Sequence, residues 1–80
     1  MKLSDGLIGS SYAVKEISLE LPAKRRLEIL GMTSDAKVTV LNSKKSGTKI
    51  IKVRGTRFAI GCKFAQQIEV EEVDKRGDMI

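Results

Sequence analysis

Few side chains in this sequence could carry out chemistry. The 80 residues include no histidine and a single cysteine, Cys62. This composition excludes histidine-based catalytic triads and any zinc or iron–sulfur site built within the chain. The neighbouring Lys63 favours a reactive thiolate at Cys62, but a half-buried structural cysteine is the simpler interpretation. No glycine-rich loop has the spacing that cradles phosphates, so the sequence predicts a protein that is not an enzyme.

Glutamates near the C-terminal end are the remaining candidates for a metal site. Glu69, Glu71 and Glu72 carry oxygen ligands of the kind that hard divalent ions prefer. Glu69 and Glu71 share one face of a predicted strand, because alternate residues of a strand point to the same side. The alternative, which we favour, is that they provide solubility or pair with nearby lysines. We expect no catalytic, cofactor-binding or metal site in the chain.

Positive charge concentrates in the middle of the chain. Residues 24–63 hold eleven lysines and arginines and two acids, a net charge of +9, whereas the remaining residues carry −4, which gives the overall +5. Such a division is typical of a protein with an anionic partner. It is equally typical of a solvated face whose charges partly neutralise one another in the fold.

Aromatic residues are too scarce for the usual recognition of single-stranded nucleic acid. The chain has only Tyr12, Phe58 and Phe64, and both phenylalanines are assigned to the core. Stacking platforms for bases need exposed aromatic rings, and so do grooves for proline-rich peptides. The basic region alone would support only weak, salt-sensitive binding to phosphates, so no specific nucleic acid is expected.

One helix is predicted, over residues 22–30. Pro22 suits the first helical position, where its missing N–H has no partner to lose. Ala23, Leu27 and Leu30 form one apolar face. Gly31 then stands where a left-handed residue ends a helix, and the following Met32 is expected to pack back onto Leu27 in a Schellman cap.

The rest of the pattern predicts strands, with a helical turn at Leu3–Asp5 capped by Ser4 and a turn at Gly9–Ser10 before them. A first strand covers 12–17, a second includes the alternation at 36–40, a hairpin covers 49–61, and a last strand includes 68–71. Residues 61–66 form a short turn that directs Phe64 and Ala65 inward. Five short strands with a helix between the first and second predict a small, partly open β-barrel.

The hairpin carries the sharpest local anomaly. Gly55-Thr56 matches a two-residue type II′ turn, which would place Arg54 opposite Arg57 and Val53 opposite Phe58. Like charges directly opposite one another destabilise a hairpin. The functional interpretation is a two-pronged donor for a carboxylate or phosphate. The alternative is that both side chains reach into solvent or that one pairs with an internal acid such as Glu28 or Asp35.

Residues spread over most of the chain resemble the FeoA family of small cytosolic proteins that accompany a ferrous-iron membrane transporter. The matching segments are Arg25-Arg26-Leu27, Leu30-Gly31-Met32-Thr33, Val38-Thr39-Val40, Val53-Arg54-Gly55 and Ala59-Ile60. The resemblance implies a mainly β fold, a small SH3-like partly open β-barrel with one short helix inserted between strands 1 and 2. It covers a domain at 1–73, followed by a flexible tail at 74–80. Ser34-Asp35 departs from the Pro-Gly turn that the family often has.

The resemblance also implies a function, that of a non-enzymatic accessory protein of ferrous iron uptake. Such a protein would act in the cytoplasm and dock on the cytosolic GTP-binding part of the Fe²⁺ transporter, reaching the membrane only through that partner. It would hold no cofactor and bind Fe²⁺ or another divalent ion weakly at most. The predicted partner-binding residues are Arg25, Arg26, Leu30, Met32, Lys52, Arg54 and Arg57. The alternatives are a basic nucleic-acid-binding or regulatory module and a homo-oligomer that associates through open sheet edges.

Overall fold

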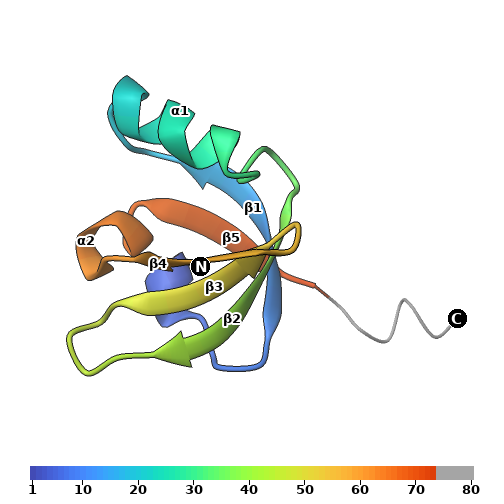
Figure 1. Cartoon of the computed structure of the whole chain (residues 1–80), viewed down its shortest axis with the longest axis vertical. Helices are drawn as coiled ribbons and strands as arrows, with labels where there is room; N and C mark the ends of the chain where they lie inside the picture. The colour runs from blue at the N-terminus through green and yellow to red at the C-terminus, as the bar shows by residue number, and fades with distance from the viewer. Residues whose placement is uncertain (74–80) are drawn as a thin grey trace, which may run out of the picture.

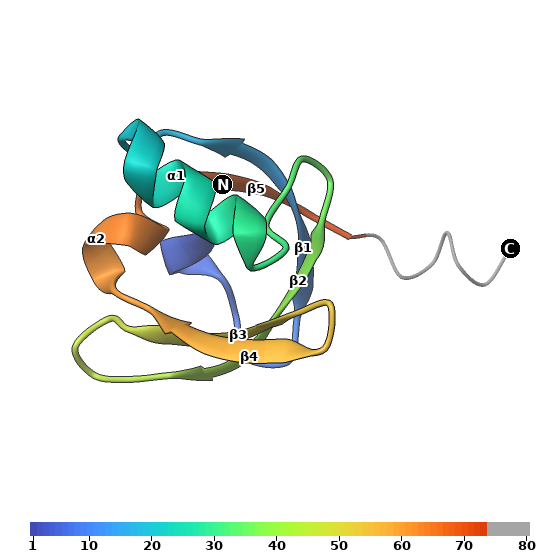
Figure 2. The same cartoon turned by 45° about the horizontal axis from the view of Figure 1, so that its top comes forward.

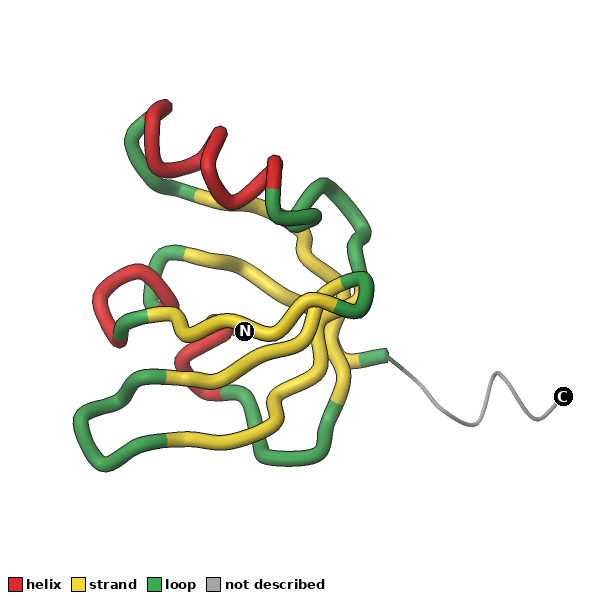
Figure 3. Tube along the Cα trace, viewed as in Figure 1, coloured by secondary structure: helices red, strands yellow, loops and turns green. Residues whose placement is uncertain are grey.

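The computed structural model describes residues 1–73, and the tail predicted at 74–80 lies outside the described residues. Strands make up the curved body of the molecule, and short helical segments interrupt the chain between them (Figures 1 and 3). The elements in chain order are the 3₁₀ turn η1 (Leu3–Asp5), β1 (Ser11–Ile17), α1 (Leu21–Ile29), β2 (Lys37–Ser43), β3 (Lys49–Val53), β4 (Thr56–Ile60), α2 (Cys62–Ala65) and β5 (Ile68–Glu72).

The five strands form one antiparallel sheet in the order β4-β3-β2-β1-β5. The sheet curls without closing, since β4 and β5 lie at its two edges and do not pair with each other. α1 connects β1 to β2 and lies across the open side from the β3–β4 hairpin (Figure 2). The predicted fold class, a mainly β and partly open barrel with one helix between strands 1 and 2, is confirmed.

Alternation along the strands builds the core. Most inward-facing residues are apolar and buried, for example Val38 and Val40 in β2 and Ile68 and Val70 in β5. Tyr12 is buried among them, and its hydroxyl oxygen accepts a hydrogen bond from the backbone N–H of Leu7 at 2.9 Å. Burial of this phenol is therefore compatible with its polarity.

The Schellman cap predicted after α1 is confirmed. The helix starts and stops one residue earlier than predicted, with Leu30 as its C-cap. Gly31 follows with a φ of 111°. Its N–H donates to the carbonyl of Glu28, and the N–H of Met32 donates to that of Leu27, both at 3.0 Å. These two bonds define a Schellman motif, and they place Met32 in the core.

The predicted hairpin register is wrong. The two turn residues are Arg54 and Gly55, not Gly55 and Thr56, and both have positive φ, 51° and 84°. That combination is a type I′ turn, whose twist matches the twist of the flanking strands. Lys52 therefore lies opposite Arg57, and Arg54 has no cross-strand partner. The predicted assignment of residues to the inner and outer faces is still correct. The observed pairing is shifted from the predicted one by two residues, and side chains along a strand alternate between faces with a period of two.

Two smaller predictions also fail, and the turn at Asp35 has an unusual backbone. η1 is preceded by Lys2 and has no side-chain cap, so Ser4 does not act as one. Phe64 is 48% exposed rather than turned inward, whereas Ala65 of the same helix, α2, is buried as predicted. Asp35 has a φ of 66° in a turn closed by a 3.0 Å bond from the N–H of Ala36 to the carbonyl of Thr33. Asp35 thus occupies a conformation that favours glycine.

Replacement of Gly31 by alanine is expected to destabilise the protein by about 1 to 2 kcal/mol, the cost of a left-handed backbone at a residue with a β-carbon. A Cβ at this position would also lie 3.0 Å from Cδ of Arg54 and 3.2 Å from Cγ1 of Val53. Urea denaturation measures the loss. Gly9→Ala is the matched control, since Gly9 also has a positive φ but has no atom within 4 Å of the added Cβ. An equal loss in the two variants would show that the contact with Arg54 and Val53 is irrelevant.

Candidate functional site

The outer face of the β2–β3–β4 region carries a row of cationic side chains. Register places Thr39 of β2 opposite Lys52 of β3, and Lys52 opposite Arg57 of β4. Lys52 and Arg57 are both exposed. The like-charged pair predicted in this hairpin therefore exists, but it consists of Lys52 and Arg57. Like charges directly opposite one another weaken a sheet, so the pair needs a reason other than folding.

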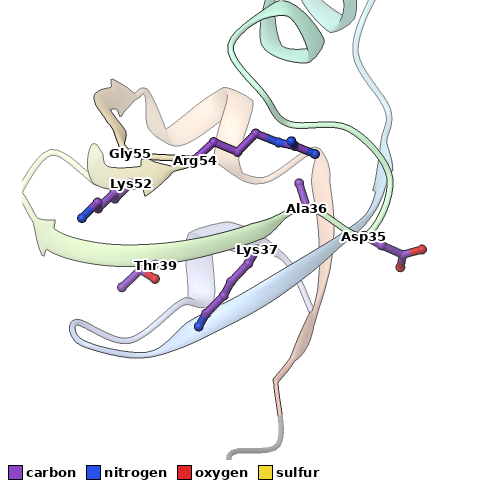
Figure 4. A pocket seen from close by; sticks show the side chains of 7 residues that line it. All are labelled: Asp35, Ala36, Lys37, Thr39, Lys52, Arg54 and Gly55. Carbon is purple, nitrogen blue, oxygen red and sulfur yellow. The ribbon is translucent and has the colours of Figure 1, made fainter.

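A shallow hollow of about 440 Å³ lies beside this row. Its lining residues are Asp35, Ala36, Lys37, Thr39, Lys52, Arg54 and Gly55. Figure 4 shows that the side chain of Arg54 extends over Ala36, whereas Lys37 and Lys52 point in another direction. The cationic groups do not converge on one point. This arrangement suits an extended anionic surface better than a single small anion.

Arg54 is held in place by the end of α1. The close approach of its Cδ to Gly31 places the aliphatic part of Arg54 against the backbone where the helix ends. Helix C-termini carry partial negative charge, which favours a nearby cation. The same residue has a φ of 51°, a left-handed conformation that costs an arginine on the order of 1 kcal/mol. Packing on Gly31 and the I′ turn therefore fix an exposed arginine in an unfavourable backbone conformation.

The outer-face cations have no internal counter-ions among residues 1–73. Ion pairs in this part of the chain join the Met1 ammonium and Lys2 to Glu69, and Lys15 to Asp35 and Glu71. Of the two forms of the alternative, the one in which both arginines reach into solvent agrees with the structure, since Arg54 and Arg57 are exposed. The carboxylate of Asp35 instead binds Nζ of Lys15 at 2.7 Å. We define the outer basic surface as Lys37, Lys52, Arg54 and Arg57.

Two of the three glutamates, Glu69 and Glu71, pair with cations, as the favoured interpretation predicted. Glu69 receives the Met1 ammonium and Lys2, and Glu71 lies 3.6 Å from Nζ of Lys15. The hydrogen bond that the Lys15 ammonium donates to the carboxylate of Asp35 is the main cause of a raised pKa at Lys15. Within the described residues, no group of three or more histidine, cysteine, aspartate or glutamate side chains is placed to hold a metal ion.

Cys62 takes a structural position. It is half-buried, as predicted, and its Sγ lies close to Gly47, where an added Cβ would be 2.8 Å away. Nε2 of Gln66 donates a hydrogen bond to the same sulfur at 3.4 Å. The sulfur therefore fills space between α2 and the loop that connects β2 to β3.

The helix residues of the predicted docking set do not all belong to one surface. Arg25 and Arg26 are exposed on α1, but neither lines the hollow beside the outer basic surface. Leu30 is 38% exposed and accessible to a partner. Met32 is completely buried, so its assignment to partner binding is wrong, because the Schellman cap turns it into the core.

Two apolar helix residues were missed. Leu21 is 56% exposed and Ile29 is 85% exposed. With Arg25 they are spaced four residues apart, which places all three on one face of α1. This spacing is present in the sequence. It was not recognised because the predicted helix began after Leu21 and because Ile29 does not belong to the apolar face predicted for that helix. We define the helix face as Leu21, Arg25 and Ile29.

Glu69→Gln is expected to reduce stability at neutral pH and to have little effect in acid. Hydrogen bonds from the Met1 ammonium and from Lys2 hold the pKa of Glu69 below its usual value. A depressed folded pKa gives stabilisation that is present above the unfolded pKa, about 4.3, and is lost as pH falls through the folded pKa. Urea denaturation between pH 2 and 7 measures it. Glu72→Gln is the control, and a difference between wild type and Glu69→Gln that persists at pH 2 would contradict the assignment.

The protein is a small, partly open barrel whose exposed basic face has no internal counter-ions among residues 1–73. The comparison with known families identifies it further. A family model, the FeoA domain, matches residues 1–72. The chain therefore belongs to the FeoA family, as the sequence resemblance predicted, and that family is associated with ferrous iron transport. No curated protein matches the chain.

Solved structures support the same assignment. The crystal structure of an iron uptake regulatory protein (FeoA) is 34% identical with a TM-score of 0.83, covering 91% of this chain and 97% of that one. The solution structure of FeoA from Chlorobium tepidum is 28% identical with a TM-score of 0.87, covering 92% and 71%.

A third similar structure comes from Stenotrophomonas maltophilia, a FeoA complexed with zinc. It is 26% identical with a TM-score of 0.76, covering 89% of each chain. That protein is described as a prokaryotic SH3 domain protein and a suggested activating factor of bacterial ferrous iron transport.

In the present chain, none of the helices within residues 1–73 is long and apolar enough to cross a membrane.

Proposed function

We propose that this protein is a non-enzymatic accessory protein of ferrous iron uptake. It acts in the cytoplasm and docks on the cytosolic GTP-binding part of an Fe²⁺ membrane transporter. Membership of the FeoA family over residues 1–72 is the observation that carries the proposal. Two features of the molecule support it: the scarcity of groups that could do chemistry, and an exposed surface whose charge is not balanced within the described residues.

The outer basic surface is the proposed site of docking. Unpaired cations at an interface attract a partner of opposite charge and fix its orientation. Arg54 has an unfavourable backbone conformation, and a partner carboxylate that accepts hydrogen bonds from its guanidinium would compensate that cost. The helix face of α1, together with Leu30 at the helix C-cap, supplies a second, more apolar contact area. Met32 has no part in it.

Charge reversal of the hairpin is expected to weaken association with the transporter's cytosolic part. The double variant Arg54→Glu, Arg57→Glu should lower affinity about tenfold or more, because it replaces attraction by repulsion at the contact. Calorimetric titration measures the affinity. The double variant Lys44→Glu, Lys45→Glu is the matched control, since it changes net charge equally in the exposed β2–β3 loop.

Three outcomes would contradict this proposal. The hairpin variant could bind with unchanged affinity, which would exclude the outer basic surface. Both variants could lose affinity equally, which would show that the effect comes from net charge and not from the outer basic surface. The wild-type chain could instead form a complex with DNA or RNA that survives physiological salt, which would favour a nucleic-acid-binding module.

The protein is also expected to hold Fe²⁺ only weakly. Of the three candidate ligands Glu69, Glu71 and Glu72, the first two are paired with cationic groups, and a ferrous ion would have to displace these groups. Anaerobic calorimetric titration of the full chain with Fe²⁺ should show no sub-micromolar binding. A sub-micromolar Kd that is lost in Glu69→Gln would overturn this expectation and assign the glutamates a metal role.

A further inference from the structure

The open sheet has two edges, and other residues of the chain cover only the β5 edge. At the β5 edge, the N–H of Val70 donates to the carbonyl of Met1 at 2.8 Å, and Lys2 forms a bridge with Glu69. The first residues of the chain therefore cover β5. At the other edge, β4 pairs with β3 alone. An uncovered edge presents free backbone donors and acceptors to any extended chain that approaches it.

Register shows which backbone groups of β4 are free. Val53 and Thr56 close the I′ turn and form a hydrogen-bonded pair. Hydrogen-bonded and non-hydrogen-bonded pairs alternate along an antiparallel ladder, so Phe58 and Ile60 also bond toward β3. The N–H and C=O of Arg57 and Ala59 point away from the sheet. Neither residue takes part in a loop or turn hydrogen bond within residues 1–73, and both are exposed.

β4 has few of the devices that usually protect an edge strand. It contains no proline, and its ladder with β3 has no bulge, whereas the β1–β5 and β2–β3 ladders each have one. What protects it is charge, from Arg57 in the strand and Lys52 beside it. Cations repel a second cationic strand, including β4 of another copy, and leave the edge open to an acidic one.

The two faces of β4 define the side chains of a suitable partner strand. On the outer face an added strand would lie next to Arg57, with Lys52 one strand further. On the inner face it would lie next to Phe58, which is half-buried and packs on the rim of the core. Because strand side chains alternate between faces, the matching sequence alternates acidic and apolar residues.

We propose that the β4 edge binds an extended acidic segment of a partner protein as a sixth strand. The backbone groups of Arg57 and Ala59 bond the segment, and its carboxylates contact Arg57 and Lys52 on the outer face. Strand addition of this kind gains affinity from the main chain and specificity from alternate side chains. The identity of the donor rests on the proposed function, under which the segment belongs to the transporter's cytosolic part.

A direct test uses a synthetic peptide and amide hydrogen exchange. The probe is a blocked hexapeptide that alternates valine and glutamate, and the matched control has lysine in place of glutamate. At saturation the acidic peptide should slow exchange at Arg57 and Ala59 about tenfold or more, whereas Phe58 and Ile60 are already slow in the free protein. Unchanged exchange at Arg57 and Ala59, or equal protection by the lysine peptide, would overturn the proposal.

Two substitutions at one position separate the backbone from the side chain. Ala59→Pro removes an outward N–H without touching the β3 ladder and should abolish protection of Arg57 by the acidic peptide. Ala59→Val keeps the N–H, and in this variant the acidic peptide should still protect Arg57. Arg57→Gln keeps the N–H but should weaken binding and its salt dependence. Binding by a folded Ala59→Pro variant with wild-type affinity would exclude strand addition.

The transporter's cytosolic part forms a separate arm of the experiment. Protection of Arg57 and Ala59 by the peptide, together with no binding of this domain to the protein, would overturn the partner proposed above and support the edge site. Binding of the domain that is sensitive to Arg54→Glu, Arg57→Glu yet leaves these two amides exchanging freely would support the proposed function and overturn a segment of this partner as the sixth strand. A result that overturns one of the two proposals therefore does not overturn the other.

Discussion

The stability of this barrel depends on side chains that enter its core from outside the sheet. Five strands of five to seven residues curl without closing, so their apolar inner faces would be left open to water. Leu3 from η1, Met32 two residues after the C-cap of α1 and Ala65 from α2 are all fully buried and complete the core. In a chain this small, which buries only about 60% of its unfolded surface, such residues are a large part of the core. The main structural role of the short helical segments is therefore to place these residues in the core.

That requirement explains which features the sequence predicted well. The Schellman cap is local: a glycine after a helical pattern and an apolar residue after it give both the left-handed turn and the direction of Met32. Strand faces are also local, because a period of two in the residue types is enough to assign them. The end of α1 and the inner faces of β2 and β5 were correct for that reason.

The failures concern choices between alternatives that are locally equivalent. Gly55 is compatible with the first position of a II′ turn and the second position of a I′ turn, and both keep Ile51 and Phe58 on the inner face. Only the twist of the assembled sheet separates them. Phe64 failed because a four-residue helix has room to bury one side chain, and Ala65 takes that place. For the candidate site, residue types predicted that Lys52, Arg54 and Arg57 face outward. They did not predict that the arginines of α1 lie apart from them or that Leu21 and Ile29 are exposed, because these depend on how the helix docks.

The contact between Gly31 and Arg54 has a consequence for how the molecule meets a partner. It brings the end of α1 next to the β3–β4 turn, so the helix face and the outer basic surface are held within one small domain. Two contact areas on one domain behave as a bivalent ligand: once one is engaged, the other is presented at a high effective concentration. Each area alone need contribute only weak affinity. A partner with both complementary patches at the right separation would be retained, whereas a protein that matches only one would dissociate quickly.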